Sequence, residues 1–190
     1  MTRSLLMLLA SIVVVVALVV LYLIPGGKGT AERPPSLAAL KPVEQVAPVP
    51  AVKFVDAAGR RYSLKSYEGR YVLLNLWASW CAPCVKELPA LATLQRAVPA
   101  RNLAVVTVDV EKGAKDKAAA FLIAHNAAEL PAFADPDLKL MQAIKAFGLP
   151  TTILIDRQGR EIARAVGAAE WDTPESIAWF EKLTAPKPAS

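Results

Sequence analysis

The chain has 190 residues, of which 54% are hydrophobic, and its 22 Lys and Arg outnumber its 17 Asp and Glu to give a net charge of +5. No basic stripe interleaved with aromatic residues accompanies this charge, so the composition does not favour nucleic-acid binding. Two Cys and one His fall short of the four or so ligands that a structural zinc site needs, which argues against a zinc protein.

The N-terminal segment from Leu5 to Ile24 is uncharged and rich in Leu and Val. At about 1.5 Å per residue, a helix of this length spans roughly 30 Å, the thickness of the hydrocarbon core of a bilayer. A cleavable signal peptide is the alternative, but it has a shorter apolar region of about 7–15 residues, and no convincing cleavage site follows Ile24. The sequence therefore predicts an uncleaved transmembrane anchor over residues 1–24.

The next segment, residues 25–50, contains prolines at Pro25, Pro34, Pro35, Pro42, Pro48 and Pro50. Such a segment cannot bury a core and favours extended, polyproline-like chain. We expect a linker with a reach of at most about 80 Å, at about 3.1 Å per residue. A single domain over residues 51–185 and a flexible tail at 186–190 follow it.

Hydrophobic patterns and turn residues predict alternating strands and helices in the domain. We expect a hairpin over 52–64, strands at 71–77, 103–110, 132–134, 151–156 and 161–166, and helices at 81–97, 115–126, 136–147 and 173–183. Asp135 is the predicted cap of the third helix, and Asp172 with Glu175 has the spacing of a capping box at the fourth. This order indicates an α/β fold with a mixed central sheet flanked by helices.

The two cysteines lie together in Trp80-Cys81-Ala82-Pro83-Cys84, directly after a buried strand and at the start of a helix. This context is typical of a redox pair. Unpaired N–H groups and the helix dipole at a helix N-terminus favour a thiolate, so Cys81 is the predicted attacking thiol. Cys84 lies one turn into the helix and is the predicted resolving thiol. The redox-active disulfide Cys81–Cys84 is the only cofactor that we expect.

A second motif, Gly148-Leu149-Pro150-Thr151-Thr152, leads into a strand. A proline here can simply mark the edge of a sheet. The functional interpretation is a cis bond at Leu149–Pro150 that faces the cysteines and offers backbone groups to a substrate strand.

The chain resembles the membrane-anchored thioredoxin-like family of bacteria, which includes the TlpA, ResA and CcmG types. The resemblance rests on these two motifs, on Leu74-Asn75-Leu76-Trp77-Ala78-Ser79 before the cysteines and on Gly167 to Asp172 near the C-terminus. The TlpA type is the most similar. The resemblance implies a thioredoxin-like fold with a central helix-strand insert, in a periplasmic domain tethered to the inner membrane. It also implies a reducing role, with an integral membrane thiol protein as electron donor. The implied substrates are disulfide-containing proteins that assemble cytochrome oxidase copper centres or cytochromes c.

The resemblance also assigns roles to single residues. Trp80, Ala82, Pro83, Leu149 and Pro150 are the expected substrate-binding residues. Asn75 stands where cytoplasmic thioredoxins carry a buried acid. Glu87, three residues after Cys84, matches an acid that affects the acidity of that cysteine in related proteins, although a solvated carboxylate on the helix surface is an equal alternative.

Two interpretations of Glu111 are open, a place near the site after the strand at 103–110 or a solvated loop, and we favour the loop. We expect His125 at the surface and Trp77 in the core. The alternatives to a reductase are a copper-binding chaperone, in which two thiolates and His125 hold the metal, and a thiol oxidant or isomerase of the same fold. A peroxidase of this superfamily needs Thr or Ser three residues before its reactive Cys, where this chain has Ala78.

Overall fold

The computed structural model describes residues 32–186, and the chain from Arg33 onward forms one compact unit. The predicted anchor and the tail residues 187–190 lie outside the described residues. Among residues 32–186, no helix combines the length and the apolar character needed to cross a bilayer.

One sheet of eight strands runs through the described chain in the order β1-β8-β7-β4-β5-β6-β2-β3. The strands are β1 (Lys41–Pro48), β2 (Lys53–Val55), β3 (Arg61–Ser63), β4 (Tyr71–Trp77), β5 (Leu103–Asp109), β6 (Phe133–Ala134), β7 (Thr151–Ile155) and β8 (Arg160–Val166). In the centre, β4 pairs parallel with β5 and antiparallel with β7, which makes the sheet mixed as predicted.

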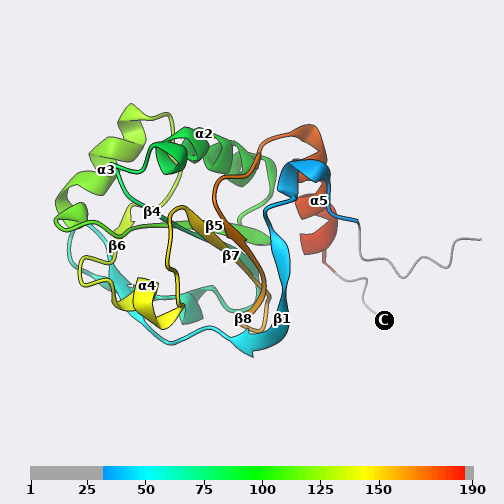
Figure 1. Ribbon diagram of the computed structural model, residues 1–190, viewed down its shortest axis with the longest axis horizontal. Helices are drawn as coiled ribbons and strands as arrows, with labels where there is room; N and C mark the ends of the chain where they lie inside the picture. The colour runs from blue at the N-terminus through cyan, green and yellow to red at the C-terminus, as the bar shows by residue number, and fades with distance from the viewer. Residues whose placement is uncertain (1–31, 187–190) are drawn as a thin grey trace, which may run out of the picture. The chain divides into compact units, whose positions relative to one another are not determined.

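Helices cover both faces of this sheet (Figure 1). They are η1 (Pro35–Leu37), η2 (Leu64–Tyr67), α2 (Ala82–Ala97), α3 (Ala114–Ala124), α4 (Lys139–Ala143) and α5 (Pro174–Thr184). The ribbon shows α2 and α3 on one side of the sheet and α4 on the other. Between β5 and α4, the segment α3–β6 is the helix-strand insert that the resemblance implies, and β6 joins β5 to the β2–β3 hairpin.

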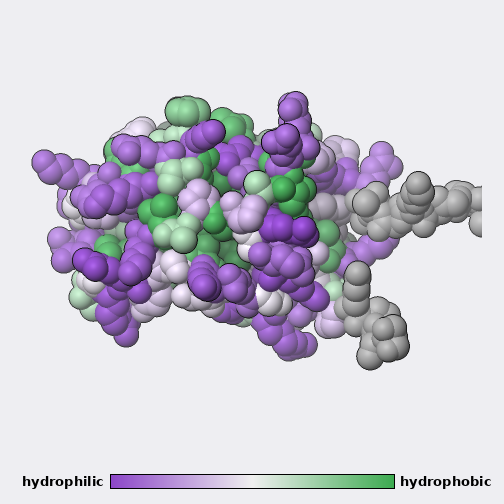
Figure 2. All heavy atoms as spheres, turned by 90° about the horizontal axis from the view of Figure 1, so that it is seen from below, coloured by the Kyte–Doolittle hydropathy of each residue, from purple (hydrophilic) through white to green (hydrophobic). Residues whose placement is uncertain are grey.

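The sheet separates two apolar cores. Successive side chains of a strand point to opposite faces, so Leu73 and Trp77 of β4 pack in the core with α2, α3 and α5, whereas Leu74 and Leu76 pack in the core with α4. Burial on both faces explains why β4 is almost continuously apolar and why its predicted bounds match the structure. From the α4 side, Figure 2 shows hydrophobic side chains near the middle of the surface with hydrophilic ones around them.

The predicted linker over residues 25–50 is wrong from Arg33 onward, because residues 33–48 belong to the fold. Leu37 and Leu40 are fully buried, and β1 pairs antiparallel with β8 at the edge of the sheet. An edge strand tolerates proline, because one side of it needs no ladder hydrogen bonds, and Pro42 and Pro48 lie within β1. Figure 1 shows η1 against α5, where the Ser36 and Ser176 hydroxyl oxygens are 2.8 Å apart.

Two helix starts also differ from the prediction. The helix predicted over 136–147 is only the short α4, because Leu138 adopts a left-handed φ of 59° before it. Asp135 still caps α4 from a distance, as its Oδ2 accepts a hydrogen bond from the Met141 N–H at 3.0 Å. The cap of α5 is Thr173, whose Oγ1 accepts from the Ser176 N–H at 3.1 Å, rather than the pair Asp172 and Glu175.

Candidate active site

The turn between β4 and α2 presents the cysteines at a helix N-terminus. The Cys81 N–H donates to the Ala78 carbonyl at 3.1 Å, which closes the turn, and the Val85 N–H donates to the Cys81 carbonyl at 3.0 Å, which opens the helix. Cys81 is therefore the N-cap residue of α2. Pro83 suits the first turn, where a backbone N–H has no partner within the helix.

Cys81 and Cys84 form a disulfide, with their Cα atoms 5.2 Å apart. Cys81 retains 6% of its surface exposed, whereas Cys84 is fully buried. Only Cys81 can therefore be reached by a bulky disulfide from outside. This asymmetry fits the unequal roles that the sequence predicts for the two thiols.

The surface around Cys81 is apolar on one side. Trp80 is 71% exposed, and Ala82 and Pro83 are also exposed. Trp77 is instead fully buried in the core, as predicted, with its ring centroid 5.3 Å from that of Phe121.

The peptide bond between Leu149 and Pro150 is cis, as predicted. Thr151 pairs with Leu76 in the sheet, so Pro150 lies level with Trp77, at the end of β4 that leads to Cys81. The Pro150 side chain is buried and its carbonyl accepts from the Gly167 N–H at 2.9 Å. Leu149 is half-buried, and within residues 32–186 its backbone N–H and C=O make no hydrogen bond. The described fold therefore leaves these two backbone groups without a hydrogen-bond partner.

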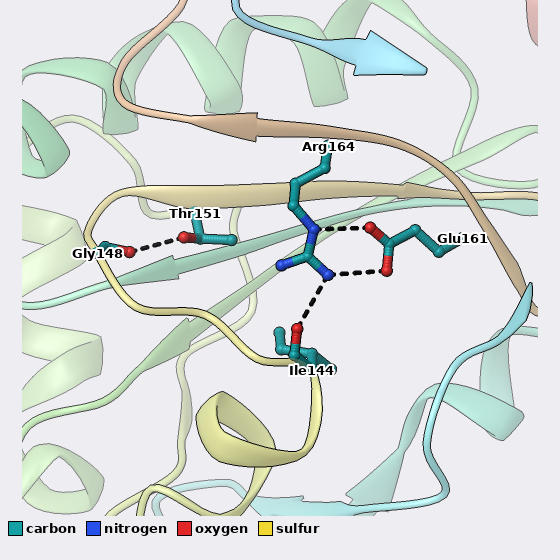
Figure 3. Close-up of polar contacts among 5 residues, drawn as sticks. All are labelled: Ile144, Gly148, Thr151, Glu161 and Arg164. Carbon is teal, nitrogen blue, oxygen red and sulfur yellow. Dashed lines mark hydrogen bonds and ion pairs between the residues drawn. The ribbon is translucent and has the colours of Figure 1, made fainter. Parts of the chain in front are cut away.

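The loop that carries Leu149 is fixed from two sides (Figure 3). Arg164 of β8 donates to both carboxylate oxygens of Glu161, at 2.7 and 2.8 Å, and to the Ile144 carbonyl at 2.9 Å. At the other end of the loop, the Thr151 hydroxyl donates to the Gly148 carbonyl at 2.6 Å. The open backbone of Leu149 is therefore presented by a rigid support.

Glu87 is buried, with 3% of its surface exposed, rather than solvated on the helix surface. Its Oε1 accepts from the Asn75 side-chain amide at 2.7 Å, and its Oε2 accepts from the Trp171 indole N–H at 3.0 Å and from the Ala169 N–H at 3.4 Å. Burial raises the pKa of Glu87, and these three hydrogen bonds oppose part of that rise. A buried carboxyl thus lies one helical turn from Cys84, beside a cavity of about 350 Å³.

Glu111 lies at the active-site turn, which differs from the solvated loop that we expected. Its Oε2 accepts from the Ser79 N–H at 3.0 Å and from the Ser79 hydroxyl at 2.6 Å. The Glu111 N–H in turn donates to Asp109 Oδ1 at 3.0 Å. Burial raises the pKa of Asp109 to about 7, and the charge of Glu111 adds to the rise.

His125 is half-buried at the end of α3, where its side chain contacts Phe121 of the same helix. Its Nδ1 lies 2.8 Å from the Phe121 carbonyl, and its ring stacks on that of Phe121 at 4.0 Å. Residues 32–186 contain no cluster of three or more His, Cys, Asp or Glu side chains placed to hold a metal ion.

A protein-family model, described as the AhpC/TSA family, matches residues 43–163. The chain belongs to the AhpC/TSA family. Within this family it is 27% identical over 131 residues to the thiol-disulfide oxidoreductase ResA of Bacillus thuringiensis, which covers 69% of this chain and 73% of ResA. To ResA of Bacillus subtilis it is 30% identical over 112 residues, which covers 59% of this chain and 62% of ResA.

Among solved structures, this chain resembles a putative thiol:disulfide interchange protein DsbE from Chlorobium tepidum. The TM-score is 0.62 at 28% identity, over 73% of this chain and 99% of that one. These relatives and the Cys81–Cys84 disulfide show a thiol:disulfide oxidoreductase of the ResA and DsbE type with a thioredoxin-like fold.

Sequence reasoning gave no role to four residues that the structure brings to this site: Ser79, Asp109, Thr152 and Trp171. Thr152 accepts from the Asn75 amide at 2.9 Å, and Trp171 contacts Glu87 from 84 positions away. For Trp171 a signal was present, since it lies in the Gly167–Asp172 segment that the resemblance singles out. The contact of Ser79 with Glu111 spans 32 positions, and nothing local in the sequence indicates it.

Proposed function

We propose that this AhpC/TSA chain is a membrane-tethered reductase of protein disulfides in the periplasm, of the TlpA type. The observation that supports this proposal best is the unequal exposure of the two cysteines at the N-terminus of α2. The unpaired backbone N–H and C=O of Leu149 add to it. The predicted anchor supports the tether, and the resemblance supports the compartment.

The chemistry is a two-step exchange of thiols. In the reduced protein, the Cys81 thiolate attacks one sulfur of a substrate disulfide, and the other substrate sulfur leaves as a thiolate. The Cys84 thiolate then attacks Cys81 Sγ, which breaks the mixed disulfide and releases the second substrate thiolate. Two electrons pass to the substrate, and the Cys81–Cys84 disulfide remains. A membrane thiol protein returns two electrons to this disulfide by the same exchange in reverse.

The site supports the first step through the start of α2. The backbone N–H groups of the first turn lack helical partners, so they stabilise negative charge on Cys81. Burial of Cys84 keeps it from reacting with substrate first, so it is available for the second step.

Glu87 supports the second step in this proposal. Cys84 must lose its proton before it attacks Cys81, and the buried carboxylate one turn away accepts that proton. Because burial raises the pKa of Glu87, the carboxyl holds a proton at higher pH than an exposed glutamate does. Asn75 then donates the hydrogen bond that orients Glu87. The buried acid that cytoplasmic thioredoxins carry at the position of Asn75, on the strand, is replaced in this proposal by Glu87 on the helix.

Leu149 provides the docking edge. An extended substrate segment that pairs with its free N–H and C=O adds a short strand beside the cysteines. The exposed Trp80 and Pro83 contribute apolar contacts from the other side.

The substrates that we propose are disulfide-containing factors for the copper centre of cytochrome oxidase, with the assembly of cytochromes c as the alternative. The likeness of Gly167–Asp172 and of the cysteine motif to TlpA-type proteins supports the copper-centre route. An integral membrane thiol protein is the proposed electron donor.

Trapping tests the proposal directly. In the full chain, Cys84→Ser leaves Cys81 able to attack but removes the resolving thiol, so mixed disulfides accumulate in the native membrane. The matched control, Cys81→Ser, keeps the buried thiol and should trap nothing. We expect a membrane thiol protein and a cysteine-bearing metallocentre factor in the trapped set, and a set that lacks both refutes the assigned partners. Full reduction of insulin disulfides by Cys81→Ser would refute the chemistry.

A further inference from the structure

We propose that Glu111 is a positioning residue for the reactive cysteine, and that it acts through Ser79. The inference rests on the proposed function, because it concerns how Cys81 is presented to a substrate disulfide. Glu111 comes from the loop after β5, so it supports the active-site turn from a different part of the chain.

The contact between Glu111 and the turn is double. One carboxylate oxygen, Oε2, accepts from both the backbone N–H and the hydroxyl of Ser79, at 3.0 and 2.6 Å. Ser79 lies two residues before Cys81, in the short connection between β4 and α2. Hydrogen bonds to a charged acceptor are stronger than those between neutral groups, so this pair fixes the turn at its midpoint.

Glu111 is itself held at both of its backbone groups. Its N–H donates to Asp109 Oδ1 at 3.0 Å, and its carbonyl accepts from the Ala114 N–H at 3.1 Å. The neighbouring Val110 N–H donates to the Trp77 carbonyl at 2.9 Å, which joins the two segments just before the Ser79 contact. The carboxylate is therefore a fixed support and not a mobile side chain.

The same carboxylate brings a negative charge to Ser79, two residues before Cys81. Glu111 lines a cavity of about 310 Å³ with Ser79, and the other charged residues that line it are Asp109, Asp116 and Lys117. A nearby negative charge disfavours a thiolate, so removal of the Glu111 charge is expected to favour thiolate formation at Cys81. Geometry and charge thus act in opposite directions, and a substitution that removes only the charge separates them.

The test compares variants of the full chain in detergent, in the reduced state. Glu111→Ala removes both hydrogen bonds and the charge, whereas Glu111→Gln keeps an acceptor oxygen for Ser79 and removes the charge. Ser79→Ala removes the hydroxyl bond and keeps the N–H bond. Asp116→Ala is the control, because Asp116 is an exposed acid of the same cavity on α3. The readouts are the rate of insulin reduction and the pH profile of alkylation of Cys81 by iodoacetamide.

We expect Glu111→Ala to lower insulin reduction about tenfold at a pH where Cys81 is fully a thiolate, since a charge-assisted contact is lost. Glu111→Gln should retain the rate within about twofold while its alkylation profile moves to lower pH. The double variant Glu111→Ala with Ser79→Ala should be no slower than Glu111→Ala alone, because both changes break one contact. Asp116→Ala should retain the wild-type rate.

A wild-type rate in Glu111→Ala overturns the inference, and so does a double variant whose losses multiply. If Glu111→Ala does not fold, the other two variants decide. The inference is overturned if Glu111→Gln has the alkylation profile of the wild type and Ser79→Ala also has the wild-type rate. Cys81→Ser is measured in parallel. Activity retained in Cys81→Ser refutes the proposed function itself, whereas an inactive Cys81→Ser beside a fully active Glu111→Ala refutes only the role of Glu111.

Discussion

Asp109 is expected to make the protein less stable as the pH rises, and Asp109→Asn should remove that loss. The Asp109 side chain is buried at the end of β5, with 1% of the residue exposed, and burial raises its pKa from an ordinary 3.8 to about 7. An amide of the same shape keeps an acceptor oxygen for the Glu111 N–H but cannot ionise. The substitution therefore isolates the cost of burying the charge.

The magnitude follows from the pKa. One pKa unit corresponds to about 1.36 kcal/mol, so the rise to about 7 is equivalent to about 4 kcal/mol. Between about pH 4 and pH 7 the folded protein keeps the Asp109 proton while the unfolded chain has released it. The unfolded state then binds fewer protons, so the free energy of unfolding of the wild type falls with rising pH in this window. Above about pH 7 the loss is complete.

Denaturant unfolding at a series of pH values measures this effect. The free energy of unfolding of Asp109→Asn should equal that of the wild type near pH 4 and exceed it by up to about 4 kcal/mol at pH 8. Asp116→Asn, a change of the same kind at an exposed position of the same cavity, is the control. A difference between Asp109→Asn and the wild type that stays constant from pH 4 to pH 8 would refute the reasoning.

Three further substitutions probe the rest of the site. Glu87→Gln removes the proposed acceptor of the Cys84 proton, so the mixed disulfide on Cys81 should resolve more slowly near neutral pH, as followed by the release of bound substrate; an unchanged rate of release would contradict the proposed role of Glu87. Trp171→Phe removes one donor to Glu87 and should lower the free energy of unfolding at pH 8 by about 1–3 kcal/mol, measured in urea. Arg164→Lys loses the two-fold contact with Glu161, which helps to fix the loop that carries Leu149. The KM for a protein substrate should rise several-fold, and the rate of Cys81 alkylation should not change. An altered alkylation rate would argue that the docking loop and the thiol do not have separate supports.

The sequence predicts the parts of this structure whose signals are local. The bounds of β4 follow from one uninterrupted apolar run, and the start of α2 follows from Cys81 and Pro83 at its first turn. The cis bond before Pro150 is predicted from the motif Gly-Leu-Pro-Thr-Thr because the same chain also contains a Cys-x-x-Cys motif.

The parts that escaped prediction depend on partners far along the chain. β1 contains two prolines and becomes a strand only because β8 offers an edge more than 100 positions later. The bonds of Glu111 to Ser79 and of Glu87 to Trp171 likewise need the folded sheet to bring the partners together. A local reading of Glu87 and Glu111 left both as solvated or undecided carboxylates, and tertiary contacts turned both into acceptors of several hydrogen bonds.

The pairing of β1 with β8 changes how far the proposed reductase can reach. Because the fold already begins at Arg33, only residues 25–32 remain to join it to the proposed anchor at Ile24. Fully extended, these residues span at most about 28 Å, compared with the reach of roughly 80 Å expected of a longer linker. With the proposed anchor in the membrane, so short a tether would restrict the reductase to donors and substrates close to the lipid surface. Lengthening the tether should therefore slow exchange with membrane partners and leave insulin reduction unchanged.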